Sequence, residues 1–400
     1  MGAVHERVNQ LDAAAFQRLQ HFMQAQLADV FPSAALAVIW RDTLILDVAW
    51  AGDGHSTTAD TLFDLASVSK LFTTTAFLRL VSEGAVGLDD CVVKVIPEFG
   101  AGGLRDIDGG QDPHSRVMLP TPAELLGQQV DPTRVTFRHL LTHTSGLPPW
   151  RAVFQVAGDI PPPPTERDPY PSEQRSRNAL RAICAYPFVG QPDGTIRYSD
   201  IGLMLIGESI VRLEGAPLDK VIQQRVTDPV GLRSVTYNPL QHGYSLAQIA
   251  PTEDDRLWRM RRCWGEVHDE NACGLGGIAG HAGLFACARD VAAFGYAWLQ
   301  RDQRLGELPF AEAVREQARS GDERRGLGWL LKARQQSSAG ERFSPDSYGH
   351  TGFTGTSLWI DPSQSLVVAC LTNRVYDGRE KMGIIAFRRA LHDLIVDILV

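Results

Sequence analysis

Apolar residues recur at intervals of three or four positions along much of this 400-residue chain, which is the spacing of one helix face. The first such stretch begins after Asp12, a residue suited to capping a helix, and stops before Pro32. The last occupies the C-terminal segment GIIAFRRALHDLIVDIL. Helices are predicted to follow Asp12, Ser67, Ser172, Asp200 and Asp290, and to end the chain.

Runs rich in β-branched and aromatic residues predict strands near both ends of the chain. The runs AALAVIWRD and TLILDVAWAG meet at Arg41-Asp42 and predict a hairpin. Near the C-terminus, SYGHTGFTGTSLWIDP and SLVVACLTNRV predict two strands joined by a turn at 361–364. Between these regions the pattern changes to short helical stretches and long connections rich in proline and glycine, such as 161–164.

These elements predict an α/β fold of the α+β type. An antiparallel sheet formed by the N- and C-terminal segments is expected to be flanked by helices and to carry an inserted, mainly helical lobe. We therefore predict one domain from residues 1–90 and 285–400 and a mainly helical domain from residues 91–284. The cleft between the two domains is the expected place for an active site.

Composition and charge narrow the range of partners. With 44% hydrophobic and 22% charged residues, the chain has the composition of a globular protein. Its formal net charge of −8 argues against nucleic acid or an anionic membrane as the partner. No apolar run approaches the roughly 18 residues that span a bilayer, and the N-terminus lacks the pattern of a secretory leader. We predict no membrane span and a cytoplasmic location, or a periplasmic one if a leader has been removed.

The strongest candidate for chemistry is Ser67-Val68-Ser69-Lys70, at the start of the helix that continues to Gly84. A serine in the first helical turn lies near backbone N–H groups without intrahelical partners, where the helix dipole favours negative charge. A lysine three residues later shares its helix face, so its amine can lie beside the hydroxyl and accept its proton if burial lowers the amine pKa. On its own, Ser-x-x-Lys is more often a chance pattern whose lysine points into water.

Two further motifs follow in order along the chain, Tyr198-Ser199-Asp200 and His350-Thr351-Gly352. Together with Ser67 and Lys70, they resemble the serine β-lactamase-like family, which includes class C β-lactamases, DD-peptidases and related esterases. The resemblance covers almost the whole chain and includes HLLTHTSGL and AGHAGLF. The stretch from HDEN to AGHAGLF is similar to a subgroup that acts on muropeptides of the cell wall.

The resemblance implies a role for each of these residues. Ser67 attacks a carbonyl, while Lys70 and Tyr198 share the transfer of its proton, and which of the two is the working base stays open. The oxyanion is expected to be held by backbone N–H groups of Ser67 and Phe353. Substrate and oxyanion contacts are expected from His350, Thr351, Gly352, Phe353 and Asp200.

Two positions depart from the family pattern. His350 replaces the lysine of K-T-G, and a histidine is mostly neutral at pH 7. We therefore expect weak recognition of penicillin-type carboxylates and a preference for neutral esters or amides. Asp200 replaces the asparagine of the family's second motif. Its charge should keep Lys70 protonated and favour Tyr198 as the base; alternatively, Asp200 caps the following helix.

We predict a serine hydrolase that works through an acyl-enzyme on a small-molecule ester, amide or muropeptide and needs no cofactor. The alternative is a penicillin-binding sensor or binding module that is acylated once and not turned over. No metal is predicted, because no H-E-x-x-H motif accompanies the scattered histidines. The histidines considered as metal ligands are His139, His143, His268 and His281. Nothing in the sequence specifies an oligomeric state.

Overall fold

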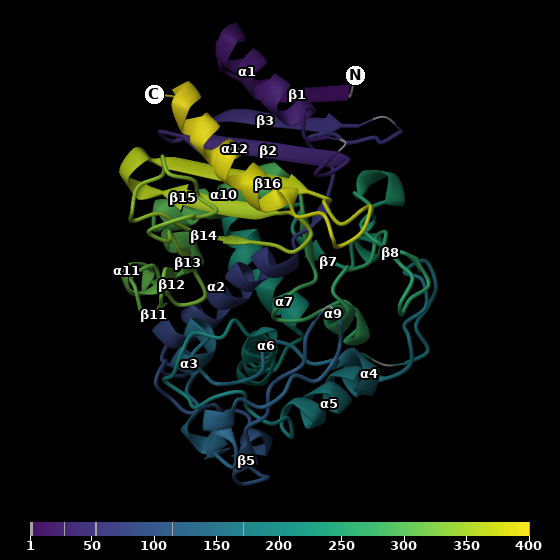
Figure 1. The fold of residues 1–400 in the computed structure, drawn as a ribbon. Helices are drawn as coiled ribbons and strands as arrows, with labels where there is room; N and C mark the ends of the chain where they lie inside the picture. Colours follow the sequence, from purple (N-terminus) through teal and green to yellow (C-terminus); the bar gives the residue numbers. More distant parts are fainter. Residues whose placement is uncertain (1–2, 28, 53, 114, 171, 400) are drawn as a thin grey trace.

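A nine-stranded antiparallel sheet organises one half of the molecule (Figure 1). The computed structural model describes residues 3–27, 29–52, 54–113, 115–170 and 172–399. The strand order is β1-β3-β2-β16-β15-β14-β13-β12-β11. The N-terminal segment contributes β1 (Ala3–Asn9), β2 (Ser33–Trp40) and β3 (Thr43–Ala51). The C-terminal segment contributes β11 (Ala318–Ser320), β12 (Glu323–Arg325), β13 (Leu330–Leu331), β14 (Tyr348–Thr351), β15 (Ser357–Asp361) and β16 (Leu366–Thr372).

The two faces of this sheet are covered by different helices, because side chains alternate along each strand. Along β2, Leu36 and Val38 pack in one hydrophobic cluster with residues of α1 (Ala13–Gln24) and α12 (Gly383–Leu399). Ala35 and Ala37 belong instead to the larger core, which also holds residues of α2 (Ser69–Ser82) and α10 (Ala288–Leu299). Figure 1 shows α12 crossing the strands on the side opposite to α10.

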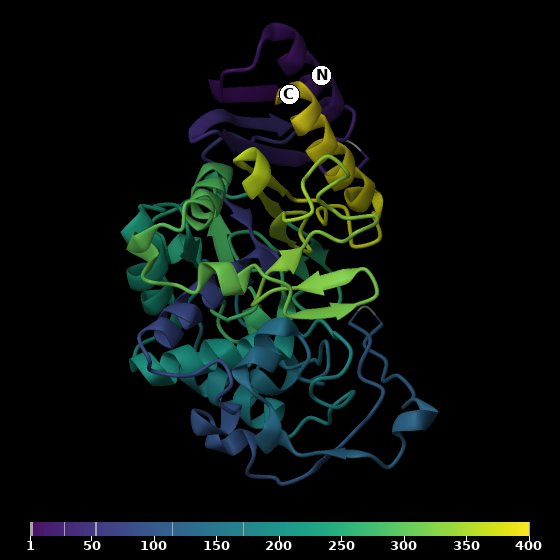
Figure 2. The same ribbon diagram turned by 90° about the vertical axis from the view of Figure 1, so that its left-hand side faces the viewer.

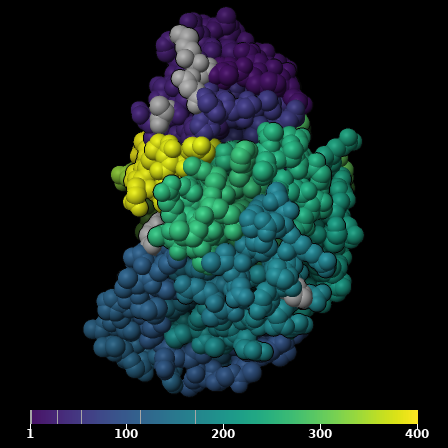
Figure 3. All heavy atoms as spheres, turned by 90° about the vertical axis from the view of Figure 1, so that its right-hand side faces the viewer, coloured from purple at the N-terminus to yellow at the C-terminus, as the bar shows by residue number. Residues whose placement is uncertain are grey.

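In the middle of the chain helices are joined by long irregular connections and the strands are short; this part, drawn in blue and teal, lies below the large sheet in Figures 2 and 3. Three small sheets are β4 (Phe63–Asp64) with β10 (Leu284–Ala286) and β7 (Thr236–Tyr237), β5 (Arg105–Asp106) with β6 (Gln129–Val130), and β8 (Asp254–Asp255) with β9 (Arg261–Arg262). The remaining α-helices are α3 (Phe137–Thr142), α4 (Phe154–Ala157), α5 (Ser172–Ile183), α6 (Asp200–Glu214), α7 (Leu218–Ile222), α8 (Asp228–Val230), α9 (Glu270–Gly274) and α11 (Phe310–Ala313).

The predicted fold class, with its large antiparallel sheet and flanking helices, is confirmed. Asp12 caps α1 as expected, since its side chain accepts a hydrogen bond from the backbone N–H of Ala15. The prediction of one strand over SYGHTGFTGTSLWIDP is wrong, because residues 352–356 form a turn that divides it into β14 and β15. The division into two domains stays a prediction. Among the described helices, none is long and apolar enough to cross a membrane.

Candidate active site

Ser67 lies in a tight turn immediately before helix α2. Strand β4 leads into this turn, and Ala66–Val68 form a single 3₁₀ turn. The sequence predicts Ser67 in the first turn of the α-helix, whereas the structure places it just before the helix begins at Ser69. Ala66 has a left-handed φ of 45°, which costs a residue with a side chain about 1–2 kcal/mol. Its N–H donates to Asp64 Oδ1 at 2.8 Å, which helps to hold this strained conformation. Strain of this kind is concentrated at functional sites.

The ammonium of Lys70 has three close polar partners. Lys70 is 1% exposed and donates to Ser67 Oγ at 2.8 Å and to the backbone oxygen of His281 at 2.9 Å. Its third contact is an ion pair with Asp200 Oδ1 at 2.7 Å. Burial would lower the pKa of Lys70, but the charge of Asp200 and the contact with Tyr198 raise it above its ordinary value. Lys70 is therefore a cation at neutral pH.

Tyr198 faces this cation from the segment just before helix α6. Lys70 Nζ lies 5.0 Å from the centre of the Tyr198 ring, and the phenol oxygen is buried beside Lys70 and Ser67 without a well-aligned hydrogen bond. Burial raises the pKa of Tyr198; the charge of Lys70 opposes this shift and that of Asp200 adds to it. Ser199, not Asp200, caps α6, because its hydroxyl accepts from the N–H of Gly202 at 3.2 Å. The Asp200 carboxylate thus remains available to pair with Lys70.

His350 lies on β14 with its ring centre 5.9 Å from that of Tyr198. The side chain is 3% exposed, and its Nδ1 lies 2.9 Å from the backbone oxygen of Thr351, to which it can only donate. Burial lowers the pKa of His350 well below its ordinary value, and the charges of Arg325 and Lys70 add to this effect. His350 is consequently neutral, and its Nε2 is a buried acceptor without a hydrogen-bond partner among the described residues.

The turn after β14 packs directly against the segment that carries Ser67. A Cβ atom on Gly352 would lie 2.6 Å from the oxygen of Leu65 and 3.3 Å from the Cβ of Ala66, so only glycine permits this approach. The hydroxyl of Thr356 donates to the same Leu65 oxygen at 2.9 Å. Phe353 follows Gly352, and its ring stacks on that of His268 with centres 5.7 Å apart. The structure thereby brings all the predicted site residues into one neighbourhood, while their catalytic roles stay predictions.

Two residues that sequence reasoning did not select also face Tyr198. The Arg325 guanidinium on β12 lies 5.1 Å from the centre of the Tyr198 ring, and the residue is 7% exposed. Its Nε and Nη2 donate to Glu323 Oε1 at 2.8 and 2.6 Å, whereas its buried Nη1 has no hydrogen-bond partner in the described part of the chain. The ring of His143 lies 4.6 Å from that of Tyr198.

His143 is held as a neutral donor. Its Nδ1 accepts from the backbone N–H of Ser199 at 3.1 Å, so the proton of the neutral ring is on Nε2. Burial lowers the pKa of His143 well below its ordinary value, and the charges of Arg325 and Lys70 add to this. The sequence signal for His143 was its place in HLLTHTSGL, a stretch that contributes to the family resemblance, and the structure shows that it ends α3 in a left-handed conformation.

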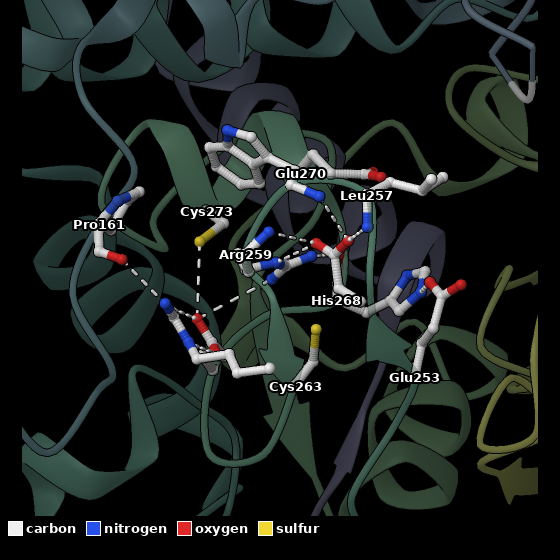
Figure 4. Close-up of polar contacts among 12 residues, drawn as sticks. Pro161, Glu253, Leu257, Arg259, Cys263, His268, Glu270 and Cys273 are labelled. Carbon is white, nitrogen blue, oxygen red and sulfur yellow. Dashed lines mark hydrogen bonds and ion pairs between the residues drawn. The ribbon is translucent and has the colours of Figure 1, made fainter.

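A buried ion-pair network supports the segment from HDEN to AGHAGLF (Figure 4). Arg259 pairs with Asp255 at 2.9 Å and donates to the backbone oxygens of Val267 and His268. The N–H of His268 in turn donates to Asp64 Oδ2 at 2.6 Å. This stretch therefore connects to the Ser67 turn through Asp64. In the described ranges, no group of three or more His, Cys, Asp or Glu side chains is arranged to hold a metal ion.

The chain matches known proteins over nearly its whole length. It is 30% identical to a protein of Salmonella agona (strain SL483) described as "Putative D-alanyl-D-alanine carboxypeptidase", over 91% of this chain and 83% of that protein. Its fold is similar to that of EstCE1, "a hydrolase with promiscuous acyltransferase activity", with a TM-score of 0.67 at 19% identity over 95% of this chain and 99% of that one. A penicillin-binding protein homologue from Caulobacter crescentus gives a TM-score of 0.67 at 17% identity over 99% and 100% of the two chains.

The model of the Beta-lactamase family matches residues 16–391. Together with the carboxypeptidase-like relative, this match supports a serine hydrolase that acts on esters or amides, as predicted. The chain belongs to the beta-lactamase family.

Proposed function

We propose that Ser67 is the nucleophile of this hydrolase and that Lys70 and Tyr198 carry its proton. The observation that supports this most directly is the 2.8 Å contact between Lys70 Nζ and Ser67 Oγ in a buried site. Ser67 Oγ forms a bond to the substrate carbonyl carbon while its proton passes to the pair formed by Lys70 and Tyr198. The bond between the carbonyl carbon and the leaving group then breaks as the pair returns the proton to the leaving group. Water attacks the acyl carbon by the same route, and the bond to Ser67 Oγ breaks as Ser67 regains a proton.

The charges of the pair decide when it can accept a proton. Lys70 keeps its proton at neutral pH, because Asp200 and Tyr198 together outweigh the effect of burial and raise its pKa, and Tyr198 is a neutral phenol because burial raises its pKa. One proton must leave this pair before Ser67 can react. Acylation should therefore become faster as the pH rises, with an apparent pKa that belongs to the pair and not to one residue.

The oxyanion is held in this proposal by the backbone N–H groups of Ser67 and Phe353. The close packing of Gly352 on Ala66 supports this assignment, since each of these residues directly precedes one of the two proposed donors. Loss of one oxyanion donor typically costs about 100- to 1,000-fold in rate. His350 contributes as a neutral acceptor beside Tyr198 and not as a cation.

We further propose that the substrate carries a carboxylate near the scissile bond, as a peptide ending in D-alanyl-D-alanine does. The preference for neutral substrates expected from the sequence rested on the loss of a lysine at position 350. Arg325 supplies a cation beside the same Tyr198 ring, and its buried Nη1 can donate to a carboxylate oxygen. The His143 Nε2–H is a second buried donor near Tyr198. A cell-wall muropeptide of this kind is the proposed natural substrate.

Labelling and turnover test this proposal together. A fluorophosphonate should add one adduct to the wild-type protein, seen by intact mass, and none to Ser67→Ala. Ser69→Ala is the matched control, because Ser69 lies in the same motif but its hydroxyl is buried and accepts from the N–H of Leu284. An acyl-D-alanyl-D-alanine peptide should release D-alanine with the wild type and with Ser69→Ala, and not with Ser67→Ala. Labelling that survives in Ser67→Ala would refute the nucleophile, and a persistent acyl adduct without product would favour the non-hydrolytic sensor.

A further inference from the structure

Arg388 is a buried arginine on α12 that donates through one nitrogen to the turn that follows β14, while its Nε has no hydrogen-bond partner among the described residues. It is 7% exposed, and its Nη2 donates to the backbone oxygens of Gly352 at 2.7 Å and Thr356 at 2.8 Å. Within the described ranges, no carboxylate forms an ion pair with it. Burial lowers the pKa of Arg388 to about 10, so the guanidinium remains charged at neutral pH.

The position of Arg388 is unusual for a residue with only a packing role. Helix α12 buries an apolar stripe that includes Ile384, Phe387, Leu391 and Ile395, and Arg388 interrupts it. Removing a guanidinium from water is costly, and apolar residues often fill such positions with equal or greater stability. A packing role could be filled without a charge, so the charge calls for another explanation.

The contact with Gly352 determines the direction of one N–H group. The Gly352 oxygen and the Phe353 N–H belong to the same peptide unit, and the described residues contain no cis peptide bond. In a trans peptide the C=O and N–H point in opposite directions. Because Arg388 holds the Gly352 oxygen toward α12, the Phe353 N–H points away from that helix. Leu65 and Ala66, which lead to Ser67, pack against Gly352 in this turn.

Both ends of the turn are fixed by the same guanidinium. The Thr356 oxygen that accepts from Arg388 also accepts from the N–H of Gly352 at 2.8 Å. On the other side of Phe353, its backbone oxygen accepts from Arg374 Nε at 2.8 Å. Hydrogen bonds from a charged donor are about twice as strong as neutral ones, and they polarise the amide that accepts them. A polarised amide is a stronger N–H donor.

We propose that Arg388 is a positioning residue that aims and polarises the Phe353 N–H as an oxyanion donor. This inference rests on the proposed function, in which that N–H binds the oxyanion formed by attack of Ser67. Arg388 itself does not touch the substrate. Its contribution grows as negative charge develops on the carbonyl oxygen, so it should affect the transition state more than substrate binding.

The test compares Arg388→Met with a matched control elsewhere in the molecule. Arg105 is also 7% exposed, and burial also lowers its pKa to about 10. It likewise donates only to backbone oxygens, those of Phe99, Ile183 and Tyr186. Arg105→Met therefore reproduces the loss of a buried, carbonyl-bound guanidinium without changing the turn at 352–356.

Three measurements separate positioning from stability: kcat and KM with p-nitrophenyl butyrate, the dissociation constant for phenylboronic acid, and Tm. In Arg388→Met, kcat should fall by about 10- to 100-fold, less than the full loss of an oxyanion donor, with KM within about threefold. Phenylboronic acid forms a tetrahedral adduct on serine whose oxygen mimics the oxyanion, so its binding should weaken by a similar factor. Arg105→Met should lower Tm while leaving kcat and boronic acid binding unchanged.

Each other outcome overturns the inference. A folded Arg388→Met with wild-type kcat and boronic acid affinity assigns Arg388 a packing role only, and an equal loss in Arg105→Met assigns the effect to stability. If Arg388→Met does not fold, Arg388→Lys tests the inference instead, because lysine keeps the charge but cannot reproduce the hydrogen bonds to the oxygens of both Gly352 and Thr356. The kcat of Arg388→Lys should then fall by at least about tenfold. Failure of the proposed function itself is distinct, since the wild-type protein would then show no adduct on Ser67.

Discussion

Replacing Asp200 with asparagine removes the charge that most directly controls the proposed proton carriers. Asp200 Oδ1 lies 2.7 Å from Lys70 Nζ, and its charge raises the pKa of both Lys70 and Tyr198. Asparagine keeps an acceptor for Lys70 but loses the charge. The pKa of both groups should therefore fall, whichever one accepts the proton of Ser67. This makes the sign of the effect independent of the identity of the base.

The geometry also gives a magnitude. Two unit charges 2.7 Å apart attract by about 6 kcal/mol at an effective dielectric constant of about 20, which is an upper limit for the change. An opposite charge at this range typically moves a pKa by about 1–3 units, or about 1.4–4 kcal/mol. We expect the rising limb of acylation rate against pH to move to lower pH by about 1–3 units in Asp200→Asn.

The assay is the pre-steady-state acylation rate with p-nitrophenyl acetate from pH 5 to pH 10. Asp193→Asn is the control, since Asp193 is an exposed carboxylate that pairs with His139 at 2.7 Å and is not among the groups that shift the pKa of Lys70. The rising limb of the acylation rate against pH in Asp193→Asn should coincide with that of the wild type. A limb in Asp200→Asn that stays in place, or moves to higher pH, would show that the charge of Asp200 does not set the protonation of the pair.

Two further substitutions test the substrate contact and the packing of the site. Arg325→Met should raise KM for an acyl-D-alanyl-D-alanine peptide by at least about tenfold, since a buried charged contact is worth about 2–5 kcal/mol, and should leave KM for p-nitrophenyl acetate unchanged; equal effects on both substrates would exclude a carboxylate contact. Gly280→Ala should lower the free energy of unfolding in urea by about 1–3 kcal/mol, because its Cβ would lie 2.2 Å from the backbone oxygen of Leu203. Gly102→Ala, with nothing within 4 Å of the added Cβ, is its control, and equal stabilities of the two variants would contradict the packing inference.

The strongly patterned elements of the fold could be predicted from the sequence, and the weakly patterned strands could not. The β2 and β3 hairpin and helix α12 each bury enough apolar surface to show their period in sequence. Strand β1 has no such pattern, because it lies at the sheet edge and keeps Glu6 and Arg7 exposed. Strands β11 to β13 have two or three residues each, and β11 and β12 are rich in arginine. Their formation depends on backbone pairing with neighbours distant in sequence, which no local pattern records.

The site divides in the same way between motif residues and residues placed by tertiary structure. Ser67, Lys70 and Tyr198 stand in short motifs, so the sequence identifies them as candidates. Arg325 lies in the charged run GDERRG, which is typical of a solvated turn, and only its place on β12 turns its guanidinium toward Tyr198. Arg388 did leave a signal, because it interrupts the apolar stripe of α12. A charged residue in such a stripe needs a partner, but the sequence does not reveal which backbone oxygens it meets.

Asp64 explains why segments so far apart in sequence converge on one hydroxyl. Its carboxylate accepts from the N–H of Ala66 at 2.8 Å and from the N–H of His268 at 2.6 Å, while its backbone oxygen accepts from the hydroxyl of Thr354 at 2.7 Å. One buried residue thus joins the strained turn before Ser67, the segment supported by Arg259, and the turn held by Arg388. Because these three parts share a junction, the left-handed conformation of Ala66 and the direction of the Phe353 N–H are fixed together. The geometry that the proposed chemistry needs is therefore a property of the assembled fold, and no single motif contains it.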